Sequence, residues 1–236
     1  MTDVLLTYGW VRSSYSALRN LSQHGIKVCV ADSNKVGMCQ WSKYKACSVS
    51  YTSHYTNESH FIDEILNICD RKQIKFILPS HNETEILARH RHKFDPSIMA
   101  LIPEVKHCEM FNNKARAYDY AKSIGIPVPR RIDYDSPTSL AKEISSVGVT
   151  RTVIKLLTGN SAKGVYYADS PKEAQQIVKD LISRYELTRD RYPQVEEQVS
   201  GEGWGSSVLY WKGRLIANFT HRRLREKITT GGTSTL

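Results

Sequence analysis

The sequence predicts an α/β protein with a parallel-sheet region followed by an α+β region, and three observations support this. Over the first hundred residues, apolar and β-branched runs alternate with helical stretches, the pattern of a parallel sheet with right-handed crossovers. From Phe111 the pattern changes, and three strand-like segments close the chain. At 236 residues the chain is long enough for one large domain or two small ones.

The first region alternates strand and helix signals. Residues 27–32 are rich in β-branched residues and end in Asp32, and Gly25 ends the preceding helix in the position of a C-terminal cap. We expect strands at residues 4–7, 27–32, 75–79 and 98–102, and helices at residues 14–24, 58–71 and 82–93.

A dinucleotide site is one possibility in this region. Gly9 follows the first strand and Asp32 ends the second, and parallel sheets bind ligands at the carboxyl ends of their strands. The G-x-G-x-x-G fingerprint of such sites is missing, because Gly9 stands alone. An NAD site is therefore disfavoured.

The second region begins with a helix at residues 112–125, which we expect Asn112 to cap and Gly125 to end. Two prolines make residues 126–129 an extended connector. Ser170, followed by a proline and then a glutamate, is a strong helix start. We expect strands at residues 131–134, 152–157, 165–168, 193–199, 206–211 and 215–220, helices at 137–147 and 170–185, and a tight turn at 212–213.

Composition limits the class of protein. No window reaches the roughly 18 apolar residues that a bilayer span needs, and the start of the chain lacks a signal-peptide pattern. The five cysteines do not have zinc-site spacing, so we expect reduced thiols and a cytoplasmic protein. Thirty-three basic and 24 acidic residues give a net charge of +9, which favours an anionic partner: nucleic acid, phosphate or a polycarboxylate.

Two lysines are candidates for anion binding. Lys114 lies in the first turn of a helix, where acidic residues are more common, and Lys155 lies within an apolar strand. Taken singly, each is typical of a solvated surface lysine.

The segment 158–164 has the composition of a phosphate-binding loop. Gly159 and Gly164 allow close backbone approach, while Ser161 and Lys163 supply a hydroxyl group and a charge. It is not a Walker A loop, because a strand rather than Lys-Ser or Lys-Thr follows Gly164. A polar hairpin loop explains the segment equally well.

Acidic and basic residues near the end of the chain are further candidates. Residues 195–203 form a strand that ends in acids and a glycine-rich bend, which suits a flat base and, at Glu202, ribose hydroxyl groups. The basic run at residues 221–225 precedes a Gly/Thr-rich segment and suits phosphate or carboxylate oxygens. The sequence has no zinc finger, RRM or helix-turn-helix pattern, so nucleic-acid binding is less favoured.

The order of these features resembles the ATP-grasp superfamily, in particular the branch similar to carbamoyl-phosphate synthase. The features are Asn113-Lys114, the connector 126–129, the strand 153–155, the loop 158–164, the acidic segment 196–203 and the basic segment 219–226 with residues 230–232. The segment before them, with residues 77–80 and 83–85, is similar to the Rossmann-like pre-ATP-grasp domain of the same enzymes.

This resemblance implies a division of the chain. Residues 1–110 would be the Rossmann-like, parallel-sheet pre-ATP-grasp domain. Residues 111–236 would be an incomplete α+β ATP-grasp domain, with a small lid subdomain at about 130–200 and the start of the large subdomain at about 201–236.

The resemblance also implies a role for each candidate residue. Phosphate contacts would come from Lys114, Lys155 and the loop with Gly159, Ser161, Lys163 and Gly164. The adenine edge would be lined by Glu196, Glu197 and Val199, and the ribose would bind Glu202. As catalytic residues, Arg223 or Arg225 would steady the phosphates or an acyl phosphate, which an amine or other nucleophile then attacks.

One departure concerns the metal. The Mg²⁺ ligands of the resembled family lie downstream of the basic segment, and no matching motif occurs before Leu236. We therefore assign no metal ligand in this chain, expect the Mg²⁺ ligands beyond Leu236, and expect the 236-residue chain to be inactive by itself. The loop is also sparse in glycine for a phosphate cover, so it is expected to be stiffer or to prefer another nucleotide.

Three functions are compared. The favoured one is an ATP-dependent carboxylate–amine ligase, or its nucleotide-binding part, with ATP and Mg²⁺ and with small carboxylate and amine substrates. A homo-oligomer is compatible with it, and a membrane partner is not expected. The alternatives are a non-catalytic nucleotide sensor and, less favoured, a basic nucleic-acid-binding protein.

Overall fold

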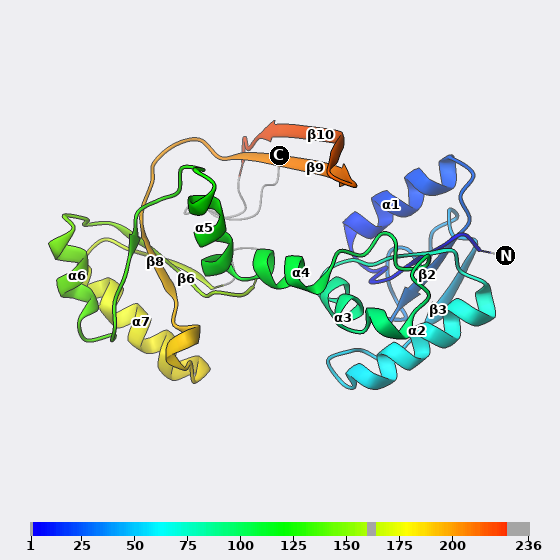
Figure 1. Ribbon diagram of the computed structural model, residues 1–236, viewed down its shortest axis with the longest axis horizontal. Helices are drawn as coiled ribbons and strands as arrows, with labels where there is room; N and C mark the ends of the chain where they lie inside the picture. The colour runs from blue at the N-terminus through cyan, green and yellow to red at the C-terminus, as the bar shows by residue number, and fades with distance from the viewer. Residues whose placement is uncertain (1, 160–163, 226–236) are drawn as a thin grey trace. The chain divides into compact units, whose positions relative to one another are not determined.

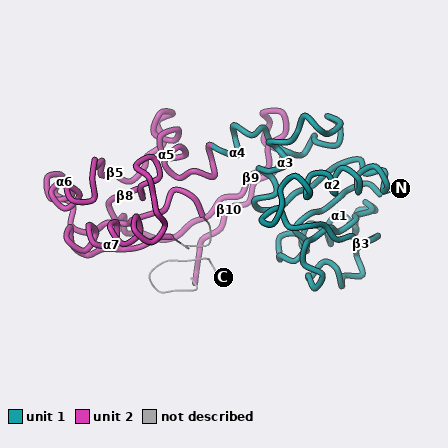
Figure 2. Tube along the Cα trace, turned by 90° about the horizontal axis from the view of Figure 1, so that it is seen from below, with its two compact units in different colours: residues 1–109 teal, residues 110–236 magenta. Residues whose placement is uncertain are grey.

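The computed structural model describes residues 2–159 and 164–225. The chain forms two compact units, Met1–Glu109 and Met110–Leu236, which Figure 2 shows in different colours. The first unit is built on a parallel sheet and the second on an antiparallel one. The α/β class predicted from the sequence is confirmed.

The sheet of the first unit has four parallel strands in the order β3-β2-β1-β4. These are β1 (Val4–Leu6), β2 (Val28–Asp32), β3 (Cys47–Ser50) and β4 (Phe76–Leu78). Strands β1 and β2 are buried throughout, as expected for central strands that are covered on both faces. Because β1 lies at the centre, the strand order reverses between β1 and β4.

Helices cover both faces of this sheet (Figure 1). Helix α1 (Arg12–Gln23) places Leu18 against Val4 and Leu6 on one face. Helices α2 (Glu58–Lys72) and α3 (Glu83–Arg89) pack against the other face, where Phe61 and Leu87 join the largest core cluster. A 3₁₀ turn, η1 (Arg91–Lys93), follows α3, so the helix expected at residues 82–93 is divided in two.

The strand expected at residues 98–102 is wrong. Asp95 accepts hydrogen bonds from the backbone N and Oγ of Ser97, and successive turns follow, with Ile102 N donating to Met99 O at 3.0 Å. The three-residue spacing of these turns buries Met99 and Ile102 and leaves Leu101 exposed. Two residues of the apolar run thus reach the core, but through turns and not through a strand.

Two further expectations need correction. The helix expected at residues 112–125 is α5 (Lys114–Ser123), and its cap is Asn113, whose Oδ1 accepts from Ala115 N and Arg116 N. Residue 112 instead ends a separate helix, α4 (Val105–Asn112), that the sequence analysis missed. It also missed β3, whose alternating exposure marks an edge strand.

The second unit contains a four-stranded antiparallel sheet in the order β5-β8-β6-β7. Its strands are β5 (Arg131–Ile132), β6 (Thr152–Lys155), β7 (Val165–Ala168) and β8 (Gln194–Glu197). Helices α6 (Leu140–Ser146) and α7 (Pro171–Tyr185) cover one face, and a 3₁₀ turn, η2 (Arg189–Arg191), precedes β8 (Figure 1). Ser170 caps α7 as predicted, because its Oγ accepts from Glu173 N.

A two-stranded ribbon completes the described part of the second unit. Strands β9 (Trp204–Trp211) and β10 (Arg214–Arg222) pair antiparallel, as predicted. Lys212 and Gly213 form the turn, and both have positive φ, which a type I′ turn requires. Within the described residues, no helix is long and apolar enough to cross a membrane.

Candidate functional site

One face of the four-stranded antiparallel sheet packs in the hydrophobic core, and the other face carries polar side chains. Ile154 and Val195 are paired neighbours that point to helices α6 and α7. Because side chains alternate along a strand, the neighbouring residues Lys155, Gln194 and Glu196 point to the opposite face. The sequence pattern of alternating apolar and polar residues therefore selects which side chains share a surface.

A buried carboxylate neutralises Lys155 on this polar face. Lys155 Nζ lies 2.5 Å from Glu196 Oε2, and the Glu196 side chain is only 4% exposed. The second carboxylate oxygen accepts a hydrogen bond from Gln194 Nε2. An isolated buried carboxylate would be costly, so this arrangement satisfies Glu196 and fixes the position of the lysine.

Lys114 lies close to the same group. It is the first residue of α5, and Asn113 caps this helix. Its backbone N donates to Leu157 O at 2.8 Å, and its Nζ donates to Gly159 O at 3.1 Å. Burial lowers the pKa of Lys114 from its ordinary value of 10.5, and the charge of Lys155 lowers it further. Two lysines far apart in the sequence thus lie close together, and the Glu196 carboxylate balances only one of their two charges.

The loop that follows β6 has a glycine with positive φ near its beginning and another at its end. Gly159 has φ +117° and Gly164 has φ +81°, and Leu156 N donates to Gly164 O at 2.8 Å. A Cβ on Gly164 would lie 2.8 Å from Leu156 Cδ1, so the position requires glycine. The predicted loop residues Ser161 and Lys163 lie outside the described residues.

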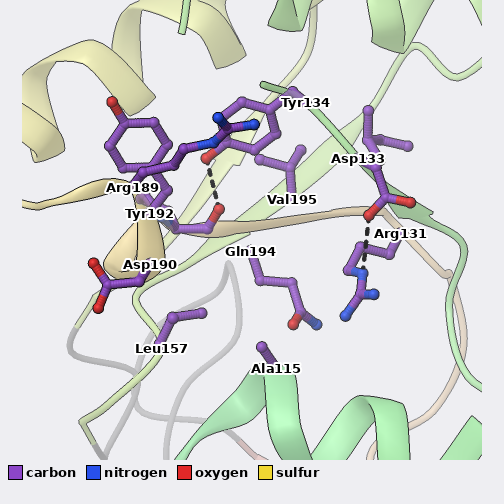
Figure 3. A pocket seen from close by; sticks show the side chains of 12 residues that line it. Ala115, Arg131, Asp133, Tyr134, Leu157, Arg189, Asp190, Tyr192, Gln194 and Val195 are labelled. Carbon is purple, nitrogen blue, oxygen red and sulfur yellow. Dashed lines mark hydrogen bonds and ion pairs between the residues drawn. The ribbon is translucent and has the colours of Figure 1, made fainter. Parts of the chain in front are cut away.

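Two neighbouring cavities open at the end of the sheet where β6 leads into this loop. The first, of about 230 Å³, is lined by Gln194 and Arg131 and by Ala115 at the start of α5. Figure 3 shows Gln194 pointing from β8 toward α5. The second cavity, of about 530 Å³, is lined by Leu157, Thr158 and Arg116 among others, and its volume is within the range of small-molecule pockets.

Several solved structures share this architecture at low sequence identity. N5-carboxyaminoimidazole synthetase from Staphylococcus aureus, complexed with ADP, has a TM-score of 0.72 and 16% identity, covering 95% of this chain and 55% of that chain. The biotin carboxylase domain dimer of Hydrogenobacter thermophilus 2-oxoglutarate carboxylase, complexed with MgADP, ADP and bicarbonate, has a TM-score of 0.67 and 15% identity, covering 87% and 46%. L-amino acid ligase from Bacillus licheniformis has a TM-score of 0.65 and 13% identity, covering 94% and 49%.

This chain has the ATP-grasp fold. Among curated proteins, it is 26% identical over 164 residues to phosphoribosylamine–glycine ligase from Archaeoglobus fulgidus, an alignment covering 69% of this chain and 34% of that protein. The chain therefore spans about a third of this relative and about half of the solved structures. No family model matches the chain.

The residues that the sequence analysis expected at the nucleotide site do not all lie together. The structure brings together Lys114, Lys155, Gly159, Gly164 and Glu196. Glu197 points to the other face of the sheet, where its carboxylate accepts from the backbone N and the Nη2 of Arg130 at 2.9 and 3.2 Å.

The remaining expected residues lie near the ribbon. Val199 is 66% exposed, in the segment between β8 and β9. Glu202 pairs with Arg222 at 3.4 Å, which links the start of β9 to the end of β10 at the open end of the ribbon. Arg223 N donates to Gly203 O at 2.7 Å, and Arg225 is the last described residue.

Sequence reasoning missed two members of the polar face. Gln194 holds Glu196, and Arg131 pairs with Asp119 at 2.8 Å and stacks over the Tyr118 ring at 4.7 Å. Gln194 lies two residues before Glu196, so the two-residue period of the strand could have identified it. Arg131 also pairs with Asp133 at 3.2 Å, two residues along the chain, but its partner Asp119 is on α5, and no local pattern indicates that pair.

The structure does not test the expected magnesium site. Within residues 2–159 and 164–225, there is no group of three or more His, Cys, Asp or Glu side chains that could hold a metal ion.

Proposed function

We propose that this chain is the nucleotide-binding part of an ATP-dependent carboxylate–amine ligase that activates a carboxylate as an acyl phosphate. The ATP-grasp fold supports the ligase class, and two of the similar structures are complexes with ADP. The chain covers about half of those proteins, so the complete reaction is a proposal about the full-length enzyme.

The observation that carries the proposal is the meeting of Lys114 and Lys155 beside Gly159. Helix α5 and strand β6 each bring one ammonium group to the beginning of the loop. Two ammonium groups beside a glycine backbone that a phosphate can approach closely suit the oxygens of a di- or triphosphate. Bound phosphates would also offset the repulsion between the two lysines.

We assign the other residues around this centre. Glu196 and the backbone of Val199 would line the adenine edge, Glu197 would support that edge through Arg130, and Glu202 would bind the ribose. Arg223 and Arg225, with the loop residues Ser161 and Lys163, would neutralise charge on the transferred phosphate. Phosphoryl transfer depends mainly on positioning and charge neutralisation, so this set of residues needs no general base.

A nucleotide-binding measurement tests the proposal. ADP or ATP should raise the melting temperature of the purified chain, because a ligand that binds only the folded state stabilises it. Lys155→Met should weaken binding by roughly 10- to 100-fold, the loss expected for a charged hydrogen bond. Lys142→Met, on the exposed side of α6, is the matched control and should bind as the wild type does.

Oligonucleotide titration in the same assay separates the alternatives. Stabilisation by nucleotides that is lost in Lys155→Met supports a ligase or a nucleotide sensor. Salt-sensitive oligonucleotide binding without any response to ADP or ATP would instead show a basic nucleic-acid-binding protein.

A catalytic assay separates the ligase from the sensor. We expect the 236-residue chain, supplied with Mg-ATP, carboxylates and amines, to turn over no ATP by itself, and measurable turnover would contradict this. The full-length protein should form an acyl phosphate that hydroxylamine traps as a hydroxamate. A full-length protein that binds ATP and yields no hydroxamate with a broad carboxylate panel would be a sensor. A cytoplasmic location and a homo-oligomer stay predictions.

A further inference from the structure

A buried polar cluster lies in the first unit, at the carboxyl ends of its parallel strands. Thr7 and Tyr8 follow β1, Tyr51 follows β3, and Glu83 begins the helix after β4. The strand order reverses between β1 and β4, and open parallel sheets bind ligands at such a point. The nucleotide proposal does not use this cluster.

Its centre is a carboxylate with an unused oxygen. Glu83 is 1% exposed, and its Oε1 accepts from the Tyr51 hydroxyl at 2.6 Å. Tyr51 OH in turn accepts from Tyr8 N at 3.1 Å. The other carboxylate oxygen, Oε2, is buried and has no hydrogen-bond partner among the described residues, whereas buried charged groups in proteins are usually paired.

Two further side chains of this cluster, His54 and Thr7, carry buried acceptors that no described residue pairs with. The His54 side chain is 5% exposed, and its Nδ1 lies 3.8 Å from Glu83 Oε1, too far for a hydrogen bond. Within the part of the chain that the structure describes, neither ring nitrogen of His54 has a hydrogen-bond partner, and the same holds for Thr7 Oγ1. A carboxylate oxygen, a hydroxyl oxygen and a neutral imidazole nitrogen can all accept hydrogen bonds.

Two stacked rings in strained backbone lie beside this cluster. Tyr8 has φ +55° and His81 has φ +61°, a conformation that residues other than glycine rarely adopt. Their rings stack with centroids 4.9 Å apart, and Tyr8 is linked to Glu83 through Tyr51. Strained backbone persists where the surrounding structure enforces it, and it is concentrated at ligand clamps.

We propose that this cluster binds a primary ammonium group of a small organic amine, with the Tyr8–His81 ring pair as its cover. A primary ammonium has three N–H donors, and the unused acceptors come from three side chains, Thr7, His54 and Glu83. Its positive charge compensates the buried carboxylate, and the aromatic ring faces favour a cation and its organic substituent.

The second buried acid of this edge is already satisfied. Asp32 accepts from Trp10 N at 2.8 Å and from Asn34 N at 2.7 Å. Burial raises the pKa of Asp32, and nearby Glu83 adds to this effect. A bound cation relieves this concentration of negative charge, whereas an anion would increase it, so the electrostatics select an amine over a phosphate or a carboxylate.

Three cations of equal charge test whether the cluster binds a primary ammonium group. Trp10 lies edge-on to Tyr8 at 5.7 Å and therefore reports on the ring pair. At constant ionic strength, n-butylammonium should change the Trp10 fluorescence and raise the melting temperature. Tetramethylammonium, which has no N–H donor, and potassium should do neither. A Trp10→Phe protein gives the background of the other tryptophans.

Substitutions test whether n-butylammonium binds at this cluster. Glu83→Gln should weaken n-butylammonium binding at least about tenfold, whereas Glu85→Gln, two residues along the same helix, should leave it unchanged. Thr7→Val removes an acceptor with little change in volume and serves if Glu83→Gln does not fold. His81→Gly keeps the left-handed backbone and removes half of the ring pair, so n-butylammonium binding should become weaker.

Equal responses to n-butylammonium, tetramethylammonium and potassium would overturn the proposal, and so would unchanged affinity in both Glu83→Gln and Thr7→Val. The measurement needs no nucleotide, and Lys155→Met should retain the amine response. The inference goes beyond the nucleotide proposal and can succeed or fail without it.

Discussion

The surroundings of Lys114 disfavour the charged form of its side chain, and a bound phosphate group would favour it again. Its partial burial and the charge of Lys155 both favour the neutral amine and lower its pKa. A bound phosphate favours the charged ammonium, so nucleotide binding should return the pKa toward its ordinary value. A bound anion would therefore offset both effects that lower the pKa of Lys114.

Because Lys114 must be protonated to pair with a phosphate, nucleotide affinity should depend on pH. Nucleotide affinity should fall as pH rises through the lowered pKa of Lys114, because the neutral amine must then take up a proton to bind. Lys114→Arg should remove this fall, since arginine stays charged, whereas the control Lys142→Arg should retain it. Isothermal titration at several pH values below 10.5 checks it, and a flat profile in the wild type would contradict it.

The stability of the ligand-free protein should change in the opposite direction. Between the lowered pKa of Lys114 and its ordinary value of 10.5, the unfolded chain binds more protons than the folded one. The contribution of Lys114 to the free energy of unfolding therefore rises with pH in this range.

At the level of single residues, the sequence indicated the lysines better than the acids. Lys114 and Lys155 were identified by their order along the chain, and the structure brings them together. Glu196 and Glu197 are adjacent in sequence, yet one neutralises Lys155 and the other holds Arg130 on the opposite face. Only the strand register distinguishes them, and register depends on a partner strand about 40 residues away.

The hairpin of β6 and β7 depends on the glycine at its end. Gly164→Ala adds a Cβ both to a left-handed backbone and to a space already filled by Leu156. We expect this variant to lower the free energy of unfolding by about 2–3 kcal/mol, measured by urea denaturation.

Gly148→Ala is the matched control for this prediction. Gly148 has φ +69°, but a Cβ there would meet nothing within 4 Å. It should cost only the backbone strain, about 1 kcal/mol. Equal losses in the two variants would show that Leu156 moves aside and that the hairpin end is not tightly packed.

A helix or strand was predicted correctly where its local sequence signals and its pattern of buried residues indicate the same element. Helix α7 has a serine cap, a proline start and an apolar stripe, and its observed bounds match the expectation closely. Residues 98–102 are apolar, but an Asx turn at Asp95 starts a series of turns that places every third side chain in the core. Composition alone cannot distinguish these two ways of burying apolar residues.

For the molecule as a whole, the order of elements was sufficient to predict two regions with different kinds of sheet. Neither the cluster around Glu83 nor the ring pair of Tyr8 and His81 could be predicted, because their members come from the ends of separate strands and meet only after the sheet has formed. The fold thus follows from local patterns, whereas the candidate sites follow from strand order.

The central position of β1 has a consequence for the protein during its synthesis. One neighbour of β1 is β2, but the other is β4, whose Phe76 pairs with Val4 roughly 70 residues away. A ribosome adds about 5–20 residues per second, so the fully apolar first strand waits roughly 4–14 s for its second partner. During that time the nascent chain exposes an unpaired strand edge, and chaperone binding near the N-terminus would protect it from aggregation.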